Sequence, residues 1–327
     1  MGEAAMDQAA TTYVETILRA ELARGDRVLS GVAPVLSHML ASSGHALVNE
    51  AIVARLRGML SDIARQLLAA AAAHPAQRRS AHAPAYYPDP VEIDALADHL
   101  AGEGPVLSHC YALAMEAHLV HRLEQRSSLD PVLSPLLQEL IASDDPAVAE
   151  LAMTALAAQS RFIQAQRRMA MPLGELPARL FQIVLGRWQA TRVTDPAEPA
   201  SADPVLRALK QDYDEGAGRL GLFARLVTAM RGGALAGLEL DHAGLSLFVS
   251  VLATLTRQPR DLAILACHER QAARLALGLR AAGLDERAIE RQFLLLEPAE
   301  RLPRAIDELP PDRAAALLAQ SAAWNPG

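Results

Sequence analysis

The chain has 327 residues, of which 51% are apolar and only 4% aromatic, and it carries a formal net charge of −7. This length exceeds that of one typical hydrophobic core, so we expect two subdomains or an extended array. The mild acidic excess argues against general nucleic-acid binding. Because Ala and Leu dominate the apolar residues and both favour helices, the composition predicts an all-α protein.

The cysteines and the apolar runs bear on where the protein resides. Cys110 and Cys267 lie far apart in apolar helical contexts, which is typical of reduced core thiols and suits a reducing cytoplasm. No basic and apolar leader is visible. The longest apolar run, residues 243–255, is interrupted by Ser246 and Ser250 and is too short to span a bilayer. We therefore expect a cytoplasmic protein without a membrane span.

The N-terminal part of the chain predicts helices separated by glycines and prolines. A cap at Asp7 and a stop at Gly25 predict the first helix, and the following segment contains Pro34, so it should be kinked or divided. Residues 45–73 show the apolar spacing of a long helix. Residues 74–90 hold four prolines and little periodicity, which predicts a loop on the surface.

Residues 143–172 form the clearest predicted helix. The side chains of Ser143 and Asp145 can accept hydrogen bonds from its first amides, and Pro146 suits its first turn. Pro172 should end the run, because proline lacks an N–H and disfavours helical geometry in the residue before it. Apolar residues recur at spacings of three and four, which predicts a buried stripe consisting of Val148, Leu151, Ala155, Ala158 and Phe162.

The rest of the chain predicts further helices around one break. We expect these helices near residues 175–190, 204–230, 241–255, 259–283, 285–296 and 312–322. Residues 192–203 lose all periodicity, which predicts a linker. The expected organisation is therefore an N-terminal helical domain (1–191), a linker (192–203) and a C-terminal helical domain (204–327).

Two short strings occur twice in the chain. PVLSH begins at Pro34 and at Pro105, and DPVL begins at Asp130 and at Asp203. Such coincidences are common in a chain rich in Ala, Leu and Val, so they give modest support to stacked antiparallel helical hairpins of the HEAT-like kind. Two packed helical bundles remain the alternative arrangement.

Several histidines are candidates for chemistry. His118 and His121 are three residues apart on a predicted helix that also holds Glu116, so they could share a face and bind a metal. Di-iron bundles carry a Glu-x-x-His motif on each of two helices, whereas this chain contains the string once, at Glu239. His38 is similar to the exposed histidine of phosphotransfer bundles, but Ala41 stands where a lysine would steady the phosphoryl group. Solvated or capping histidines are the simpler interpretation, and the metal and phosphoryl sites are alternatives.

The polar side of the clearest helix presents a second kind of candidate. Arg161 and Arg168 are seven residues apart, which is two helical turns, and Gln164 lies between them on the same face. No acidic residue of the helix is placed to pair with them. Arginine favours bidentate contacts with carboxylates and is enriched at interfaces, so this face is suited to an acidic protein partner. An ordinary solvated helix face is the simpler interpretation.

One part of the chain resembles a known group of proteins. The segment from Ala217 to Phe293, which contains the string GALAGLELDHAGLSLFVSVLATL, resembles an uncharacterised alphaproteobacterial family of α-helical, HEAT-like proteins of unknown function. The resemblance rests on the apolar pattern of the C-terminal half. It implies helical repeats and a bacterial cytoplasm, and it assigns no site residue.

The sequence favours a binding function over catalysis. It contains no phosphate-binding glycine loop, no zinc cysteine pattern and no G-x-S-x-G elbow, so we expect no catalytic residue and no cofactor. We expect a non-enzymatic helical scaffold or regulatory protein that binds a protein partner. The alternatives are a small-molecule or phosphoryl-handling signalling regulator and a metal-binding helical enzyme. The sequence leaves a homo-oligomer open.

Overall fold

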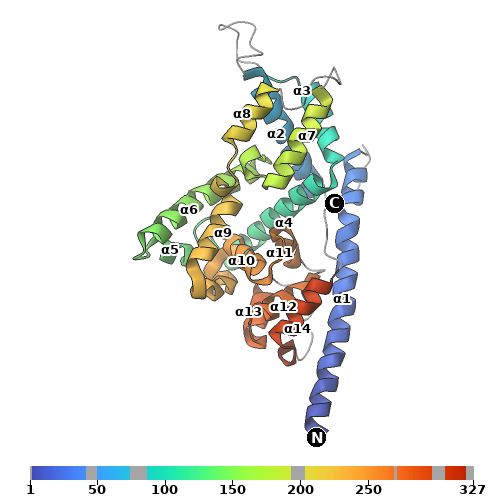
Figure 1. Ribbon diagram of the computed structural model, residues 1–327, viewed down its shortest axis with the longest axis vertical. Helices are drawn as coiled ribbons and strands as arrows, with labels where there is room; N and C mark the ends of the chain where they lie inside the picture. Colours follow the sequence, from blue (N-terminus) through green and yellow to red (C-terminus); the bar gives the residue numbers. More distant parts are fainter. Residues whose placement is uncertain are drawn as a thin grey trace. The chain divides into compact units, whose positions relative to one another are not determined.

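The computed structural model describes residues 2–41, 50–73, 87–192, 203–268, 271–296 and 306–321, without the side chains of residues 2–11, 37–41 and 307. Its regular structure is helical, and these residues contain no β-strand (Figure 1). The expected all-α class is therefore confirmed. No helix within the described ranges is long and apolar enough to cross a membrane.

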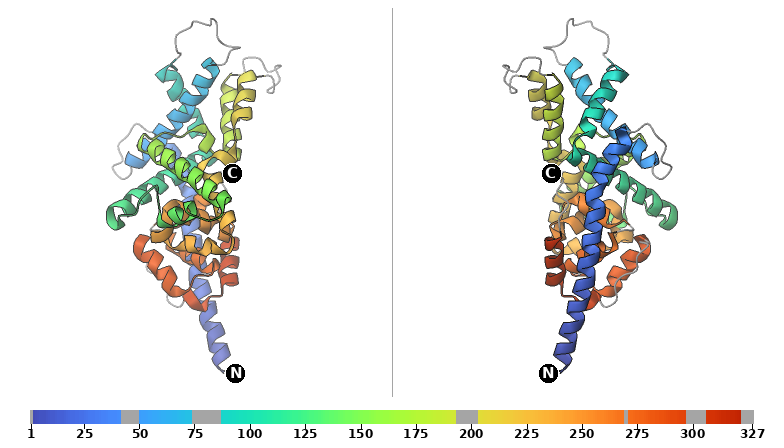
Figure 2. Two further views of the ribbon diagram at one scale, coloured as in Figure 1. Left: turned by 90° about the vertical axis from the view of Figure 1, so that its left-hand side faces the viewer. Right: turned by 90° about the vertical axis from the view of Figure 1, so that its right-hand side faces the viewer.

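Fourteen α-helices are seen in these residues (Figures 1 and 2). In chain order they are α1 (Gly2–Ala41), α2 (Glu50–Ala73), α3 (Pro90–Ala101), α4 (Gly104–Ser127), α5 (Pro135–Ile141), α6 (Pro146–Arg167), α7 (Ala178–Arg192), α8 (Pro204–Asp212), α9 (Arg219–Met230), α10 (Leu240–Thr256), α11 (Arg260–Ala266), α12 (Ala272–Ala281), α13 (Glu286–Leu296) and α14 (Pro311–Gln320). The 3-10 helices are η2 (Leu173–Glu175), η4 (Glu215–Ala217), η5 (Arg231–Leu238) and η7 (Ile306–Glu308).

Contacts divide the chain into two compact units, each assembled from segments far apart in the sequence. Unit 1 comprises Met1–Val32, Met115–Ser160 and Leu222–Pro326, and unit 2 comprises Ala33–Ala114 and Arg161–Gly221. The sequence-based division into residues 1–191 and 204–327 stays a prediction. Most of the expected linker (193–202) and of the expected surface loop (74–86) lies outside the described residues.

Four helices begin in the same way, with an Asp or Ser directly before a proline. In α6, Asp145 Oδ1 accepts a hydrogen bond from Ala147 N at 2.9 Å. The start predicted for this helix at Pro146 is confirmed. Equivalent caps occur at α3, α5 and α8, where the capping residues are Asp89, Ser134 and Asp203. The side-chain oxygen satisfies an amide that the helix leaves unpaired, and proline needs no such partner at the first turn.

Several expected helix boundaries differ from the structure. The clearest predicted helix ends at Arg167 and not at Pro172, and the first helix begins at Gly2 and not after a cap at Asp7. The helix expected to stop at Gly25 continues as α1 to Ala41, with Pro34 inside it. A Cβ atom at residue 25 would lie 2.5 Å from Gln271 Oε1, so this glycine permits a close approach within unit 1 instead of ending the helix. The single helix expected over residues 259–283 is divided into α11 and α12, whereas its stop at Gly283, which has a φ of 100°, is confirmed.

Helix α10 forms the core of unit 1. It is buried on nearly every side, and it packs against α5, α11, α12, α13 and η5. A helix that is apolar all round must lie inside a protein, because no face of it favours water. The apolar run at residues 243–255 is thus a core helix. Its buried residues include Leu247, Phe248, Val249, Val251 and Leu252.

Within unit 1, polar contacts attach α1 to the C-terminal helices. Arg274 of α12 is buried and pairs with Asp26 of α1. Arg313 of α14 donates two hydrogen bonds of 2.8 Å to the Glu15 carboxylate. These hydrogen bonds lower the pKa of Glu15, so the carboxylate stays charged and the ion pair is maintained at neutral pH.

Unit 2 is built on α2, which packs against α3 and α8, while α3 also packs against α7. Phe181 of α7 stacks on Tyr213 with ring centroids 4.0 Å apart. Arg192 lies over the Trp188 ring at 4.5 Å and forms an ion pair with Asp203 at 2.8 Å, so the two residues that flank positions 193–202 are in contact. The buried apolar residues of α2 are Val53, Leu56, Met59, Leu60, Ile63, Ala64 and Leu67.

Replacing Phe162 tests whether the predicted stripe is a core. Its side chain is 2% exposed, and the Arg219 guanidinium lies 3.5 Å from its ring centroid within unit 2. We expect Phe162→Ala to lower the free energy of unfolding by about 3–5 kcal/mol, through lost burial and a cavity. Glu150→Ala, at an exposed position of the same helix, is the control and should change it by less than about 0.5 kcal/mol. Equal small effects in urea denaturation would contradict a buried stripe.

Candidate functional site

The polar face predicted on α6 is exposed. The side chains of Arg161 and Gln164 project from the last two turns of the helix, and Arg168 lies in the turn that follows it. All three are exposed, and none of their side chains has a partner among the residues that the structure describes. We call these three residues the arginine face. Its geometry fits the exposure expected from the sequence, while its binding role stays a prediction.

The turn after α6 is fixed to α2 by hydrogen bonds within unit 2. The buried Asp62 carboxylate accepts a hydrogen bond from Met171 N at 2.9 Å. Gln66 donates to Met171 O at 2.8 Å and accepts from Leu173 N at 3.1 Å. Two helical turns before Asp62 in α2, Arg55 donates to the carbonyl oxygen of Gln166 in the last turn of α6 at 2.7 Å. These bonds hold the C-terminal end of α6 and the turn in one conformation.

The same junction concentrates positive charge. Arg57 and Arg167 are exposed, and Arg55 is half-buried, so three more arginines lie on the segments that meet here. Burial lowers the pKa of Arg55, but a guanidinium remains charged at neutral pH. Although the chain as a whole is acidic, this part of unit 2 is locally basic. It is therefore suited to contact with carboxylates.

A glycine of α2 permits the close approach between α2 and the turn. Met169 has a φ of 57°, and a Cβ atom added to Gly58 would lie 2.6 Å from Met169 Cβ and 3.0 Å from Met169 O. Any larger residue at position 58 must push the turn away from the helix. Sequence reasoning could not detect this requirement, because a glycine inside a helix by itself indicates only reduced helix propensity.

Replacing Gly58 with Ala tests this approach. We expect Gly58→Ala to lower the free energy of unfolding by about 1–3 kcal/mol, because the added methyl group overpacks the junction. Gly186→Ala in α7 is the matched control, since no atom lies within 4 Å of the added group. It should stabilise the protein by up to about 1 kcal/mol through helix propensity. Equal effects of the two changes in chemical denaturation would contradict a close contact at Gly58.

The described residues do not form a metal-ligand set around the predicted histidines His118 and His121. His118 and His121 are both exposed on α4, and His121 contacts Gln125 at 2.9 Å and Glu124 at 3.9 Å. Within the described ranges, no group of three or more His, Cys, Asp or Glu residues is placed to hold a metal. His38 belongs to α1, but its side chain lies outside the described part of the chain.

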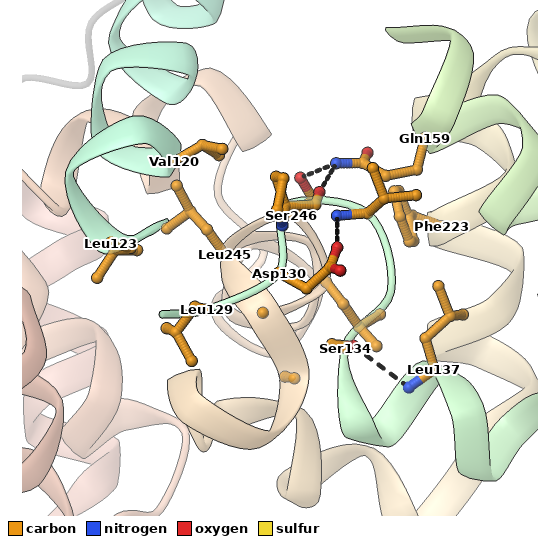
Figure 3. Close-up of a pocket in the computed structure, with 15 residues that line it drawn as sticks. Val120, Leu123, Leu129, Asp130, Ser134, Leu137, Gln159, Phe223, Leu245 and Ser246 are labelled. Atoms are coloured by element: carbon orange, nitrogen blue, oxygen red, sulfur yellow. Dashed lines mark hydrogen bonds between the residues drawn. The ribbon is translucent and has the colours of Figure 1, made fainter. Parts of the chain in front are cut away.

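Unit 1 contains a cleft that the sequence did not indicate (Figure 3). Its empty volume is about 410 Å³, which includes space open to solvent. Segments from five helices and one loop meet around it, all within unit 1. The lining residues are Val120, Leu123, Leu129, Asp130, Pro131, Val132, Ser134, Leu137, Gln159, Phe223, Ala243, Gly244, Leu245, Ser246 and Leu247. We call it the Asp130 cleft, after the one charged residue in this set.

Polar side chains organise the loop that borders the Asp130 cleft. Asp130 Oδ1 accepts hydrogen bonds from Val132 N at 2.7 Å and Leu133 N at 2.9 Å. Gln159 Nε2 donates to Pro131 O at 2.9 Å and to Ser246 Oγ at 3.0 Å (Figure 3). Gln159 therefore joins the loop to α10. Both contacts fix the backbone of the loop, so the cleft is preformed.

A break in α10 brings the helix against this loop. Gly244 has a φ of 69° and a ψ of 158°, which is not helical. A Cβ atom at this position would lie 3.1 Å from Ser134 Cβ. The left-handed φ and the close approach both favour glycine here. Residues 245–256 then continue as a helix whose first turn borders the cleft.

An ion pair between the fully buried Glu116 and the largely buried Arg260 lies behind Ser246. Arg260 donates to the two oxygens of Glu116 at 2.8 and 2.7 Å, and Ser246 Oγ donates to Glu116 Oε1 at 2.9 Å. Burial by itself disfavours the charged guanidinium, but the adjacent carboxylate outweighs it and raises the pKa of Arg260. Glu116, which the sequence placed among possible metal-site histidines, is therefore a partner of Arg260.

The cysteines are buried thiols, as the sequence indicates. Burial raises the pKa of Cys267 to about 12, although Arg260 and Arg122 oppose the rise. The thiol is therefore protonated at neutral pH and a poor nucleophile. Cys267 belongs to the core of unit 1 and adds no chemistry to the cleft.

Comparison with models of protein families, with curated proteins and with solved structures gave no match to this chain. The resemblance to an alphaproteobacterial helical family thus stays a prediction. The candidate sites are defined by their geometry alone, namely an arginine face in unit 2 and a cleft in unit 1.

Breaking the buried pair tests its role in unit 1. We expect Arg260→Ala to cost about 3–5 kcal/mol of unfolding free energy, because Glu116 is left buried and uncompensated. The folded-state pKa of Glu116 would then lie above its unfolded value, so the loss should shrink as pH falls through that folded pKa. The exposed pair of Arg291 and Glu239, 3.9 Å apart, supplies the control. Arg291→Ala should cost at most about 1 kcal/mol.

Chemical denaturation at several pH values measures both effects. A loss in Arg260→Ala that stays constant from neutral to acidic pH would contradict a charged, buried Glu116.

Proposed function

We propose that the protein is a non-enzymatic helical scaffold or regulator that binds an acidic protein partner through its arginine face. The observation that supports this proposal most directly is the exposure of Arg161, Gln164 and Arg168 without side-chain partners in the described part of the chain. Arginine side chains without an ion-pair partner keep their donors for a carboxylate of another molecule.

The rigidity of the junction also supports binding. Hydrogen bonds from Asp62, Gln66 and Arg55 hold the end of α6 and its turn against α2. A surface that is already ordered loses little conformational entropy when a partner binds. The nearby arginines of α2 add positive charge that steers an acidic surface toward this site.

The double variant Arg161→Glu/Arg168→Glu tests the proposal. Its melting temperature should stay close to that of the wild type, because exposed charges contribute little to folding stability. Its affinity for an acidic partner should fall by about tenfold or more, since two attractive contacts become repulsive. The assay is fluorescence anisotropy with a labelled decaglutamate peptide at low ionic strength, followed by capture of any acidic protein that co-purifies with the wild type.

The matched control changes net charge by the same amount at another place. Arg225 and Arg287 are exposed residues of unit 1, and Arg225→Glu/Arg287→Glu should keep most of the peptide affinity. Two results would contradict the proposal. One is wild-type affinity in the Arg161/Arg168 variant, and the other is an equal loss in both variants, which would show that net charge alone governs binding.

A further inference from the structure

We propose that the Asp130 cleft of unit 1 binds a small molecule that has an apolar body and an amine or guanidinium group. This inference does not rest on the proposed function, because the arginine face belongs to unit 2. It depends on three properties of the cleft as the described residues form it, which are its apolar walls, its single carboxylate and the lack of a cationic side chain in its lining.

The walls of the cleft are mainly apolar. Val120 and Leu123 of α4, Leu137 of α5 and Phe223 of α9 surround the space together with Leu245 (Figure 3). Ligand sites are typically concave, apolar and a few hundred Å³ in volume, with a small number of polar groups that fix orientation. Because the 410 Å³ of empty space includes open solvent, the enclosed part of the cleft is smaller, and it suits at most a ligand of one ring or one short aliphatic chain.

The carboxylate of Asp130 is oriented but retains binding capacity. Its Oδ1 atom is occupied by Val132 N and Leu133 N. Its Oδ2 atom makes no hydrogen bond to the described residues, so it can accept one from a ligand without loss of the loop contacts. A carboxylate held in place by backbone amides is preorganised for a cation and has little entropy left to lose.

The other polar groups of the lining also favour a ligand that donates hydrogen bonds. Gln159 Nε2 already donates to Pro131 O and to Ser246 Oγ, and Ser246 Oγ donates in turn to Glu116. The donors of these side chains are thus used within the protein. Among the residues that the structure describes, none of those lining the cleft is an Arg, Lys or His. An anionic ligand would meet the Asp130 charge without a compensating cation, so its binding is disfavoured.

Three probes of nearly equal shape test the proposal on the full chain. Phenethylamine carries the ammonium group, phenethyl alcohol is its neutral counterpart, and phenylpropanoate is its anionic counterpart. We expect isothermal titration calorimetry to give the order phenethylamine, phenethyl alcohol, phenylpropanoate, from tightest to weakest. Because Asp130 is exposed, the ammonium should improve the affinity over the alcohol by up to about fivefold, as expected for an ion pair in contact with solvent.

Two variants locate the binding. Asp130→Asn keeps an oxygen that can accept from the loop amides but removes the charge, so it should weaken phenethylamine by up to about fivefold and leave phenethyl alcohol unchanged. Val120→Trp places a large side chain at a half-buried lining position and should weaken both probes. The variant Arg161→Glu/Arg168→Glu should bind phenethylamine like the wild type, which separates this test from that of the proposed function.

Several results would overturn the inference. They are no measurable binding of phenethylamine, a preference for the anion or the alcohol, or wild-type affinity in both cleft variants. An acetylated and amidated Ala-Arg-Ala tripeptide distinguishes a free amine from a side chain of a partner protein. If the tripeptide binds more tightly than phenethylamine and depends on Asp130, the cleft is a docking site for a protein and the small-molecule assignment is wrong.

Discussion

Unit 1 depends on the pairing of one buried carboxylate with one guanidinium. Glu116 is fully buried, and a charge in that position is tolerated only when a cation and hydrogen-bond donors meet it. Arg260 and Ser246 supply them, so α4, α10 and the start of α11 are fixed relative to one another. Ser246 also receives the hydrogen bond from Gln159, which extends the same network to α6 and to the loop at the Asp130 cleft. The position of the cleft therefore follows from the buried pair.

Unit 2 uses a buried carboxylate for a different purpose. Asp62 accepts from the backbone of the turn after α6, with Arg65 and Gln66 also in contact with it. Asp62 thus binds the backbone of a turn, whereas Glu116 in unit 1 binds a side chain of a second helix. As a result, the C-terminal end of α6 is held at a defined position and its polar side chains are presented on an ordered base. Stability and the proposed recognition are thus linked, because the same hydrogen bonds serve both.

The arginines show how one residue type takes several roles in this chain. Arg219 lies over the ring of Phe162, Arg274 pairs with Asp26, and Arg260 pairs with Glu116, all buried or nearly so. Arg161 and Arg168 are exposed. The spacing within α6 accounts for the exposure of Arg161, because the opposite face of the helix is the apolar stripe, whereas Arg168 lies in the turn after the helix. No local pattern distinguishes the buried ones, since the partners of Arg260 and Arg274 lie 144 and 248 residues away in the sequence.

The sequence by itself determined the all-α class, the capped start of α6 and the exposure of its polar face. It also determined the burial of Ala155, Ala158 and Phe162 in the predicted stripe, of which Val148 and Leu151 are only half-buried. These features depend on neighbours within one or two helical turns, so periodicity and capping residues reveal them. It did not reveal that Gly25 and Pro34 lie within α1, because local propensity is overridden when packing rewards a continuous helix. The Glu116–Arg260 pair, the close contact at Gly58 and the Asp130 cleft were decided by tertiary structure alone. Each of them joins residues that are distant in the chain, and their interaction energy exists only when the fold has brought them together.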